Sequence, residues 1–259
     1  MGRPKATVSF CGAPLICRGL KRLGHIADEL IITSNDKDSL GFLCSGVTLD
    51  KLRLVSDLYE KRSALNGLYT ALLAASNPYV AVVACDMIFA SAPLLTAEYE
   101  ALELSGADAA VPRTSHGYEP FHAVYRRETC LPLIKAALDQ GQTKATVWFE
   151  KAKLIEFTPA MVLHADPRGG SFVNVNTPQE LADMEQRILN ETMTKIANLP
   201  EDMGGQTIDC DNNSECHQQI LVVDEGHIRN NMLVSHHTSC DLSCGHTQHL
   251  QLQSVALQR

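Results

Sequence analysis

The segment VAVVACDMIF, residues 80–89, constrains the fold most strongly, because it is an almost continuous apolar run interrupted by one carboxylate. Such a run is typical of a strand buried on both faces, as in a parallel sheet covered by helices. An ionised side chain at its end is costly to bury unless a partner compensates the charge. The sequence therefore predicts a central strand whose end brings Asp86 against a compensating group.

Helix-like and strand-like segments alternate around this run. DELIITSN (28–35) resembles YVAVVACD (79–86) in being short, apolar and β-branched. The intervening segment 63–76 is predicted to be helical, because its leucines recur at helical spacing and would lie on a sheet. These leucines are Leu65, Leu68, Leu72 and Leu73.

The alternation continues after the Asp86 strand. A helix is predicted over 92–106 and a strand over 107–112. The segment 177–189 is predicted to begin a helix, with Thr177 as N-cap, Pro178 in the first turn and Glu180 completing a capping box. This alternation indicates an α/β fold with a mostly parallel sheet and helices on both faces.

Polar side chains stand at the ends of the predicted strands. In sheets of this type ligands bind at the carboxyl ends of the strands, where Asn35, Asp57 and Asp86 all fall. Two interpretations of Asp86 remain open. It ligates Mg²⁺, which proteins hold with one or two carboxylates plus substrate phosphates, or it only caps the next helix or closes a turn. Arg3 and Lys5, in a Gly/Pro-containing loop near the start, suit a triphosphate but are also typical of a solvated terminus.

The composition changes near residue 193. Every aromatic residue lies at or before Phe172, so the remainder has little from which to build a core. We therefore expect a globular domain over 1–192 and a poorly structured tail over 193–259. The tail carries cysteines and histidines of the zinc-ligand type, although their spacing is not that of the usual paired C-x2-C sites. These residues are Cys210, Cys216, His217, Cys240, Cys244, His246 and His249.

Charge and hydropathy exclude several classes of partner. The formal net charge of −8 disfavours binding to nucleic acid or anionic lipid, and no apolar segment is long enough for a membrane span. The start lacks the apolar core of a signal peptide, and the nine cysteines fit reduced thiols better than a disulfide framework. We expect a cytoplasmic protein.

Several motifs run in order from Met1 to about Ile188. The most specific are ACDM, EPFHAVY and FVNVNTP; the others are MGRPKA, GAPLICRGLKRL, DELIITSN, LVSD, LNGLYTALLAA and SFVNVNTPQEL. Together these motifs resemble the molybdenum cofactor guanylyltransferase family of MobA-like nucleotidyltransferases. The resemblance implies a Rossmann-like α/β fold and an enzyme that joins GMP from GTP to molybdenum-bound molybdopterin, releasing diphosphate, with Mg²⁺ as cofactor. It also implies contact with molybdoenzymes or other proteins of cofactor biosynthesis.

The resemblance assigns roles to individual residues. Lys5 matches a lysine that contacts the GTP phosphates. Asp57 matches an aspartate that recognises the nucleotide, and Asp86 matches the metal ligand. The guanine-side asparagine of the family falls near Thr33 or Asn35. Further matches on the pterin side are Glu119, His122, Asn174 and Asn176. For His122 a second interpretation stays open, that of a histidine satisfied inside a strand.

The sequence departs from the family at its start. The family begins with a strand that leads into a Gly-rich LAGG loop, whereas this sequence begins at the Met-Gly that closes that loop. Loss of a central strand would leave its neighbours with unpaired edges, and the loop amides normally cradle the triphosphate. We interpret this as a start that lies upstream of Met1. A smaller departure is Ile88, where the family usually has proline.

The sequence leaves three alternatives to the guanylyltransferase open. A close variant would use CTP or attach a nucleotide to a sugar phosphate. A second alternative is a non-catalytic relic that binds nucleotide or pterin. A third is a partner binder that responds to metal through its tail.

Overall fold

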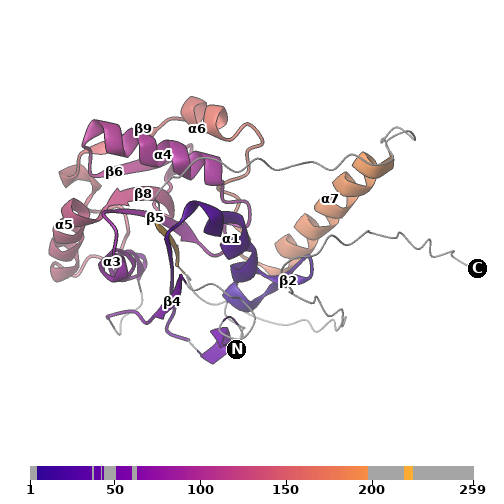
Figure 1. The fold of residues 1–259 in the computed structure, drawn as a ribbon, viewed down its shortest axis with the longest axis horizontal. Coiled ribbons are helices and arrows are strands. Elements are labelled where there is room, and N and C mark those ends of the chain that lie inside the picture. The colour runs from indigo at the N-terminus through magenta and orange to yellow at the C-terminus, as the bar shows by residue number, and fades with distance from the viewer. Residues whose placement is uncertain are drawn as a thin grey trace, which may run out of the picture.

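The structure is a computed structural model that describes residues 5–36, 38–41, 43, 51–59, 63–197 and 219–223. Its centre is an eight-stranded sheet with the order β4-β3-β10-β5-β8-β6-β7, to which β9 is added beside β6 (Figure 1). The strands are β3 (Glu29–Thr33), β4 (Leu52–Val55), β5 (Tyr79–Ala84), β6 (Ala109–Thr114), β7 (Gly117–Tyr118), β8 (His122–Arg126), β9 (Leu154–Phe157) and β10 (Gln219–Val223). The strands β4, β3, β10 and β5 are mutually parallel, and β8 is antiparallel to β5. The expected α/β class is confirmed.

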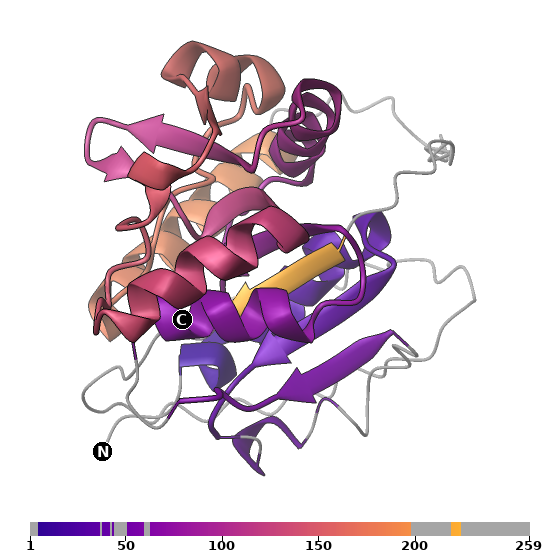
Figure 2. The same cartoon turned by 90° about the vertical axis from the view of Figure 1, so that its left-hand side faces the viewer.

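Helices cover both faces of this sheet. The helices α3 (Ala64–Ala74) and α5 (Arg127–Asp139) pack together on one face, which is toward the viewer in Figure 2. The opposite face carries α1 (Leu15–Leu23), α4 (Ala92–Ser105) and α6 (Pro159–Ala165). The long helix α7 (Pro178–Ala197) lies to one side. No described helix is both long and apolar enough to cross a membrane.

The helices begin where the sequence places capping residues. Ser63 accepts from the Asn66 amide at the start of α3, and Ser91 accepts from the Leu94 amide at the start of α4. The predicted face of α3 is largely confirmed, since Leu65, Leu68 and Leu72 are fully buried. The inclusion of Leu73 in that face is wrong: its side chain is 40% exposed, because adjacent positions on a helix point about 100° apart.

A small hairpin near the N-terminus and several single-turn helices complete the described structure. The short strands β1 (Ser9–Phe10) and β2 (Ala13–Pro14) pair antiparallel through a turn in which Cys11 and Gly12 have positive φ. Single 3₁₀ turns occur at η1 (Lys5–Thr7), η2 (Gly24–Ile26), η3 (Asp38–Leu40) and η4 (Phe149–Lys151). A minor hydrophobic cluster of Phe10, Leu15, Ile88, Val175 and Leu181 joins this hairpin to the start of α7. Ile88 therefore packs in the interior.

The central position of the sheet is filled from the C-terminal segment. β10 pairs in parallel with β3 on one side and with β5 on the other. The expectation that these neighbouring strands have unpaired edges is therefore wrong. Part of the segment expected to be poorly structured, residues 219–223, is a strand. Its sequence QILVV is β-branched and apolar, which suits a parallel strand between two apolar neighbours even without aromatic residues.

Candidate active site

Asp86 follows Cys85 in the turn after β5, at the carboxyl edge of the sheet. Its side chain is only 7% exposed, and the chain turns at once, since the Met87 amide donates to the Ala84 carbonyl at 3.1 Å. The next turn is closed by the Ala90 amide, which donates to the Met87 carbonyl at 3.0 Å. Residues 86–90 thus form a compact loop between β5 and α4. We refer to them below as the Asp86 loop.

The motif FVNVNTP meets the Asp86 loop. Asn174 forms an isolated antiparallel bridge with Met87, and the Val175 amide donates to the Asp86 carbonyl at 3.4 Å. Two of the three most specific motifs of the sequence therefore lie side by side. The side chains of Asn174 and Asn176 are exposed beside this bridge.

The predicted capping box at the start of α7 is confirmed. The Thr177 hydroxyl accepts from the Glu180 amide at 3.1 Å, and the Glu180 carboxylate accepts from the amides of Thr177 at 3.2 Å and Asn176 at 2.8 Å. α7 begins at Pro178, as predicted. This cap fixes the backbone of Asn176 relative to the helix.

Asn35 and Asp57 form a reciprocal pair at the ends of β3 and β4. The Asn35 amide nitrogen donates to Asp57 Oδ2 at 2.9 Å, and Asn35 Oδ1 accepts from the Asp57 backbone amide at 2.9 Å. Thr33 lies inside β3, with 2% exposure. Of the two candidates for the guanine-side contact, Asn35 is the one whose side chain reaches the surface.

Glu119 and His122 occupy different environments. Glu119 is partly exposed and accepts a hydrogen bond from the Thr114 hydroxyl at 3.0 Å. His122 is fully buried in β8, where Nε2 accepts from the Ser91 amide at 3.1 Å and the ring meets Phe172 edge-on. The prediction of a direct substrate contact by His122 is therefore corrected, and the interpretation as an interior histidine fits its placement.

The structure describes only the backbone of Lys5, which lies in η1 next to α1. The phosphate contact assigned to Lys5 stays a prediction. Arg3 and the cysteines and histidines of the predicted tail site lie outside the described residues.

Three arginines that received no role from the sequence converge beside the Asp86 loop. Arg22 lies over the ring of Phe89, with its guanidinium carbon 5.9 Å from the ring centre. Partial burial lowers the pKa of Arg22, and the positive charges of Arg168 and Arg18 lower it further, whereas Asp166 opposes them. Arg18 is held by the carbonyl of Phe10 at 2.7 Å. The sequence signal that could have revealed this group was the spacing of Arg18 and Arg22, which lie one helical turn apart. The approach of Arg168 to them depends on the fold.

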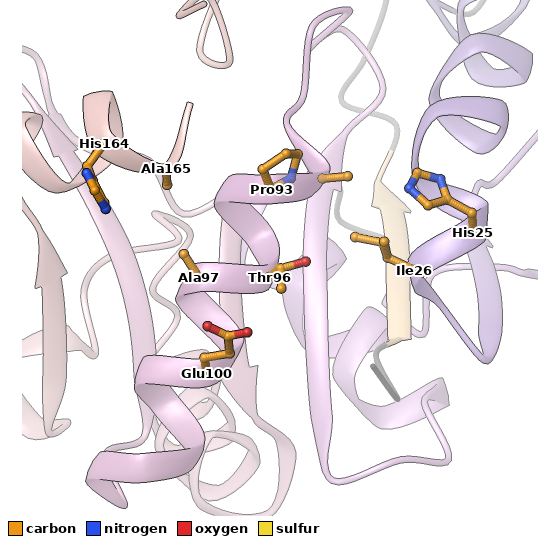
Figure 3. Close-up of a pocket in the computed structure, with 9 residues that line it drawn as sticks. His25, Ile26, Pro93, Thr96, Ala97, Glu100, His164 and Ala165 are labelled. Carbon is orange, nitrogen blue, oxygen red and sulfur yellow. The ribbon is translucent and has the colours of Figure 1, made fainter. Parts of the chain in front are cut away.

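A cavity of about 500 Å³ lies elsewhere, between η2, α4 and α6 (Figure 3). Its polar lining includes His25, Glu100 and His164, and none of the predicted site residues whose side chains the structure describes contributes to it. Within the described parts of the chain, no group of three or more histidine, cysteine or acidic side chains is placed to hold a metal ion. A carboxylate such as that of Asp86, beside a loop at the end of a strand, fits a Mg²⁺ ion that takes its other ligands from phosphates and water.

Comparison with known proteins agrees with this arrangement. Residues 1–155 match the MobA-like NTP transferase domain. The chain belongs to this family. It is accordingly a nucleotidyltransferase, and the expected enzyme class is confirmed.

Individual relatives extend the match beyond that domain. A protein of Natranaerobius thermophilus named "Probable molybdenum cofactor guanylyltransferase" is 31% identical over 194 residues, which cover 74% of this chain and 91% of the relative. The molybdenum cofactor guanylyltransferase of Desulfosudis oleivorans is 29% identical over 188 residues, which cover 72% of this chain and 88% of the relative.

Solved structures show the same fold. Molybdopterin-guanine dinucleotide biosynthesis protein A of Archaeoglobus fulgidus superposes with a TM-score of 0.61 at 25% identity, over 72% of this chain and 91% of that one. The 4-diphosphocytidyl-2C-methyl-D-erythritol synthase of Anaerococcus prevotii superposes with a TM-score of 0.55 at 13% identity, over 71% and 93%. The latter likeness concerns the fold alone.

Proposed function

We propose that this MobA-like nucleotidyltransferase transfers GMP from GTP to molybdenum-bound molybdopterin, giving the guanine dinucleotide form of the cofactor and diphosphate. The observation that carries the proposal is the bridge between Met87 and Asn174, which brings the asparagine motif to the loop of the metal-ligand candidate Asp86. The names of the relatives support the choice of substrates.

The Asn35–Asp57 pair suits recognition of a guanine base. Guanine presents adjacent N–H donors on its Watson–Crick edge, whereas cytosine presents one amino donor beside an acceptor. A carboxylate accepts hydrogen bonds only, and Asn35 holds that of Asp57 in place. This pairing favours GTP over CTP.

The phosphates would lie between Asp86 and the positively charged side chains. Asp86 would hold Mg²⁺, which when bound neutralises charge on the phosphates during the transfer. Lys5 would add a compact positive charge at the leaving diphosphate, and Arg22 with Arg168 would attract an anionic group of the acceptor.

The reaction requires positioning more than covalent chemistry from the protein. A phosphate oxygen of the pterin attacks the α-phosphorus of GTP, the bond from this phosphorus to the bridging oxygen breaks, and diphosphate leaves with the bond's electron pair. Glu119, Asn174 and Asn176 would orient the acceptor for this in-line attack.

The test is product identification with the whole protein. It is incubated with Mg²⁺ and molybdenum-loaded molybdopterin and with either GTP or CTP, and the nucleotide product is identified by mass spectrometry together with diphosphate release. We expect the guanine dinucleotide, and much less cytosine product. Exclusive use of CTP, or turnover only with a sugar phosphate as acceptor, would contradict the proposal.

A further inference from the structure

A buried acid–imidazole pair lies behind the Asp86 loop. Glu98 of α4 and His122 of β8 are both fully buried, and Glu98 Oε1 lies 3.4 Å from His122 Nδ1. This distance is slightly longer than a good hydrogen bond, and neither carboxylate oxygen has another hydrogen-bond partner among the described residues. A charged residue almost never lies fully buried without such a partner. The position of Glu98 therefore calls for a functional explanation.

The other nitrogen of His122 fixes the end of the Asp86 loop. Nε2 accepts from the backbone amide of Ser91 at 3.1 Å, so this nitrogen carries no proton. The proton of the neutral ring is then on Nδ1, which faces Glu98. Ser91 is also the N-cap of α4, since its hydroxyl accepts from the Leu94 amide. His122 thus holds the junction between the Asp86 loop and α4.

The charge of the pair changes near neutral pH. Burial raises the pKa of Glu98 to about 7, and the contact with His122 opposes that rise. Among the described residues, Tyr125, also on β8, is a further titratable group that interacts with Glu98. Burial raises the pKa of Tyr125 well above its usual value, and its hydroxyl donates to the Pro120 carbonyl, so it stays neutral.

The two protonation states of Glu98 favour opposite tautomers of His122. An ionised carboxylate can only accept, so it selects the tautomer with the proton on Nδ1 and leaves Nε2 free to accept from Ser91. A protonated Glu98 can donate to Nδ1, which favours the tautomer with the proton on Nε2. In that tautomer the ring and the Ser91 amide are both donors, and the bond between them is lost.

We propose that Glu98 is a positioning residue, which selects the tautomer of His122 that holds Ser91 and thereby the loop carrying Asp86. The link to turnover rests on the proposed function of Asp86, but the link from Glu98 to Ser91 does not. The Asp86 loop is then held firmly above neutral pH and loosened below it.

The experiment is NMR on the whole protein with ¹⁵N-labelled histidine and backbone, at pH 6 and pH 8. Ring nitrogen shifts report the tautomer of His122, and amide hydrogen exchange, corrected for its intrinsic pH dependence, reports the Ser91 bond. We expect an unprotonated Nε2 at pH 8 and, at pH 6, about ten-fold weaker protection of the Ser91 amide, which corresponds to loss of one hydrogen bond.

Variants separate positioning from simple packing. Glu98→Leu should lower Ser91 protection at both pH values, whereas Glu98→Gln, whose amide oxygen still accepts from Nδ1, should restore protection and remove its dependence on pH. Glu100→Gln, on the exposed side of the same helix, is the matched control and should behave as the wild type. A proton on Nε2 at pH 8, or equal Ser91 protection in the wild type and Glu98→Leu, would overturn the proposal.

A second readout connects the pair to the active site. Mg²⁺-dependent GTP affinity, measured by calorimetry at both pH values, should follow the order of Ser91 protection. If the tautomer and exchange results hold while GTP affinity does not follow them, the role proposed for Asp86 fails and the positioning of Ser91 stands.

Discussion

The backbone of Asn174 pairs with that of Met87, immediately after Asp86, so a segment from late in the fold closes on the loop of the central strand. Asn174, whose side chain is exposed, is thereby held beside the Asp86 loop by backbone contacts that do not depend on this side chain. This separation of scaffold from side chain makes the position suitable for mutation.

Asn174→Ala is expected to reduce nucleotide transfer without loss of stability. Substitution of an exposed side chain usually changes the free energy of unfolding by no more than about 0.5 kcal/mol, so the melting temperature should stay the same. The KM for the acceptor should rise if Asn174 orients it. Asn190→Ala, an exposed amide on the far part of α7, serves as control. An unchanged KM would remove Asn174 from the binding site.

Asn35 and Asp57 should behave as a coupled pair in nucleotide binding. Because the two residues hydrogen-bond each other, Asn35→Ala and Asp57→Ala should each weaken GTP binding. In the double variant, the loss of binding free energy should be smaller than the sum of the losses in the two single variants. A coupling free energy of about 1 kcal/mol is expected from calorimetric affinities of the four proteins. Strict additivity would show that the pair does not act on the nucleotide as a unit.

Global stability should fall as pH rises through the titration of Glu98. Its pKa in the folded protein is about 7, against 4.5 for the unperturbed group, so the folded state favours the protonated form. The associated stability is fully present below pH 4.5 and is lost as pH rises to 7. Glu98→Gln should exceed the wild type in free energy of unfolding at pH 8 by up to about 3 kcal/mol, and the difference should shrink toward pH 4.5.

Urea unfolding of both proteins between pH 5 and 8 measures this difference. A constant offset across that range would show that Glu98 does not titrate in the folded protein. A fall in global stability at high pH is compatible with a firmer Asp86 loop there. The cost of burying the Glu98 charge lowers the free energy of unfolding of the whole protein, whereas the tautomer of His122 affects only the hydrogen bond to Ser91.

Removal of β10 should destabilise the protein, contrary to what composition indicated. A chain that ends at residue 197 loses a strand paired on both sides, whereas a chain that ends at residue 230 keeps it and is the matched control. Leu221→Pro should lower the melting temperature much as truncation at residue 197 does, because proline removes a hydrogen-bond donor from a central strand. Equal melting temperatures for the three proteins and the full chain would show that β10 does not support the sheet.

Local sequence signals predicted most of the fold and part of the site. The capping box at Thr177 and Glu180 and the apolar run before Asp86 depend on neighbours in sequence, and the structure contains both. The sequence placed Asn35 and Asp57 at the ends of strands, but their mutual hydrogen bonds depend on the pairing of β3 with β4.

Three features could not be predicted because they arise from contacts between distant segments. Glu98 has the sequence context of an ordinary helical surface residue, and only β8 shows why it is buried beside His122. The approach of Arg168 to Arg22 requires the loop after α6 to return to α1. The pairing of residues 219–223 in the centre of the sheet was hidden by the polar composition around them.

The central claim is that Asp86 holds the metal ion required for nucleotide transfer, and Asp86→Asn tests it most directly. Asparagine keeps the shape and removes the charge, so diphosphate release with GTP, Mg²⁺ and molybdenum-loaded molybdopterin should fall by at least about a hundred-fold, as for loss of a principal electrostatic group. The melting temperature should stay close to that of the wild type. Asp28→Asn, an exposed carboxylate at the opposite edge of the same sheet, should retain full activity. Near-normal turnover by Asp86→Asn would contradict the account.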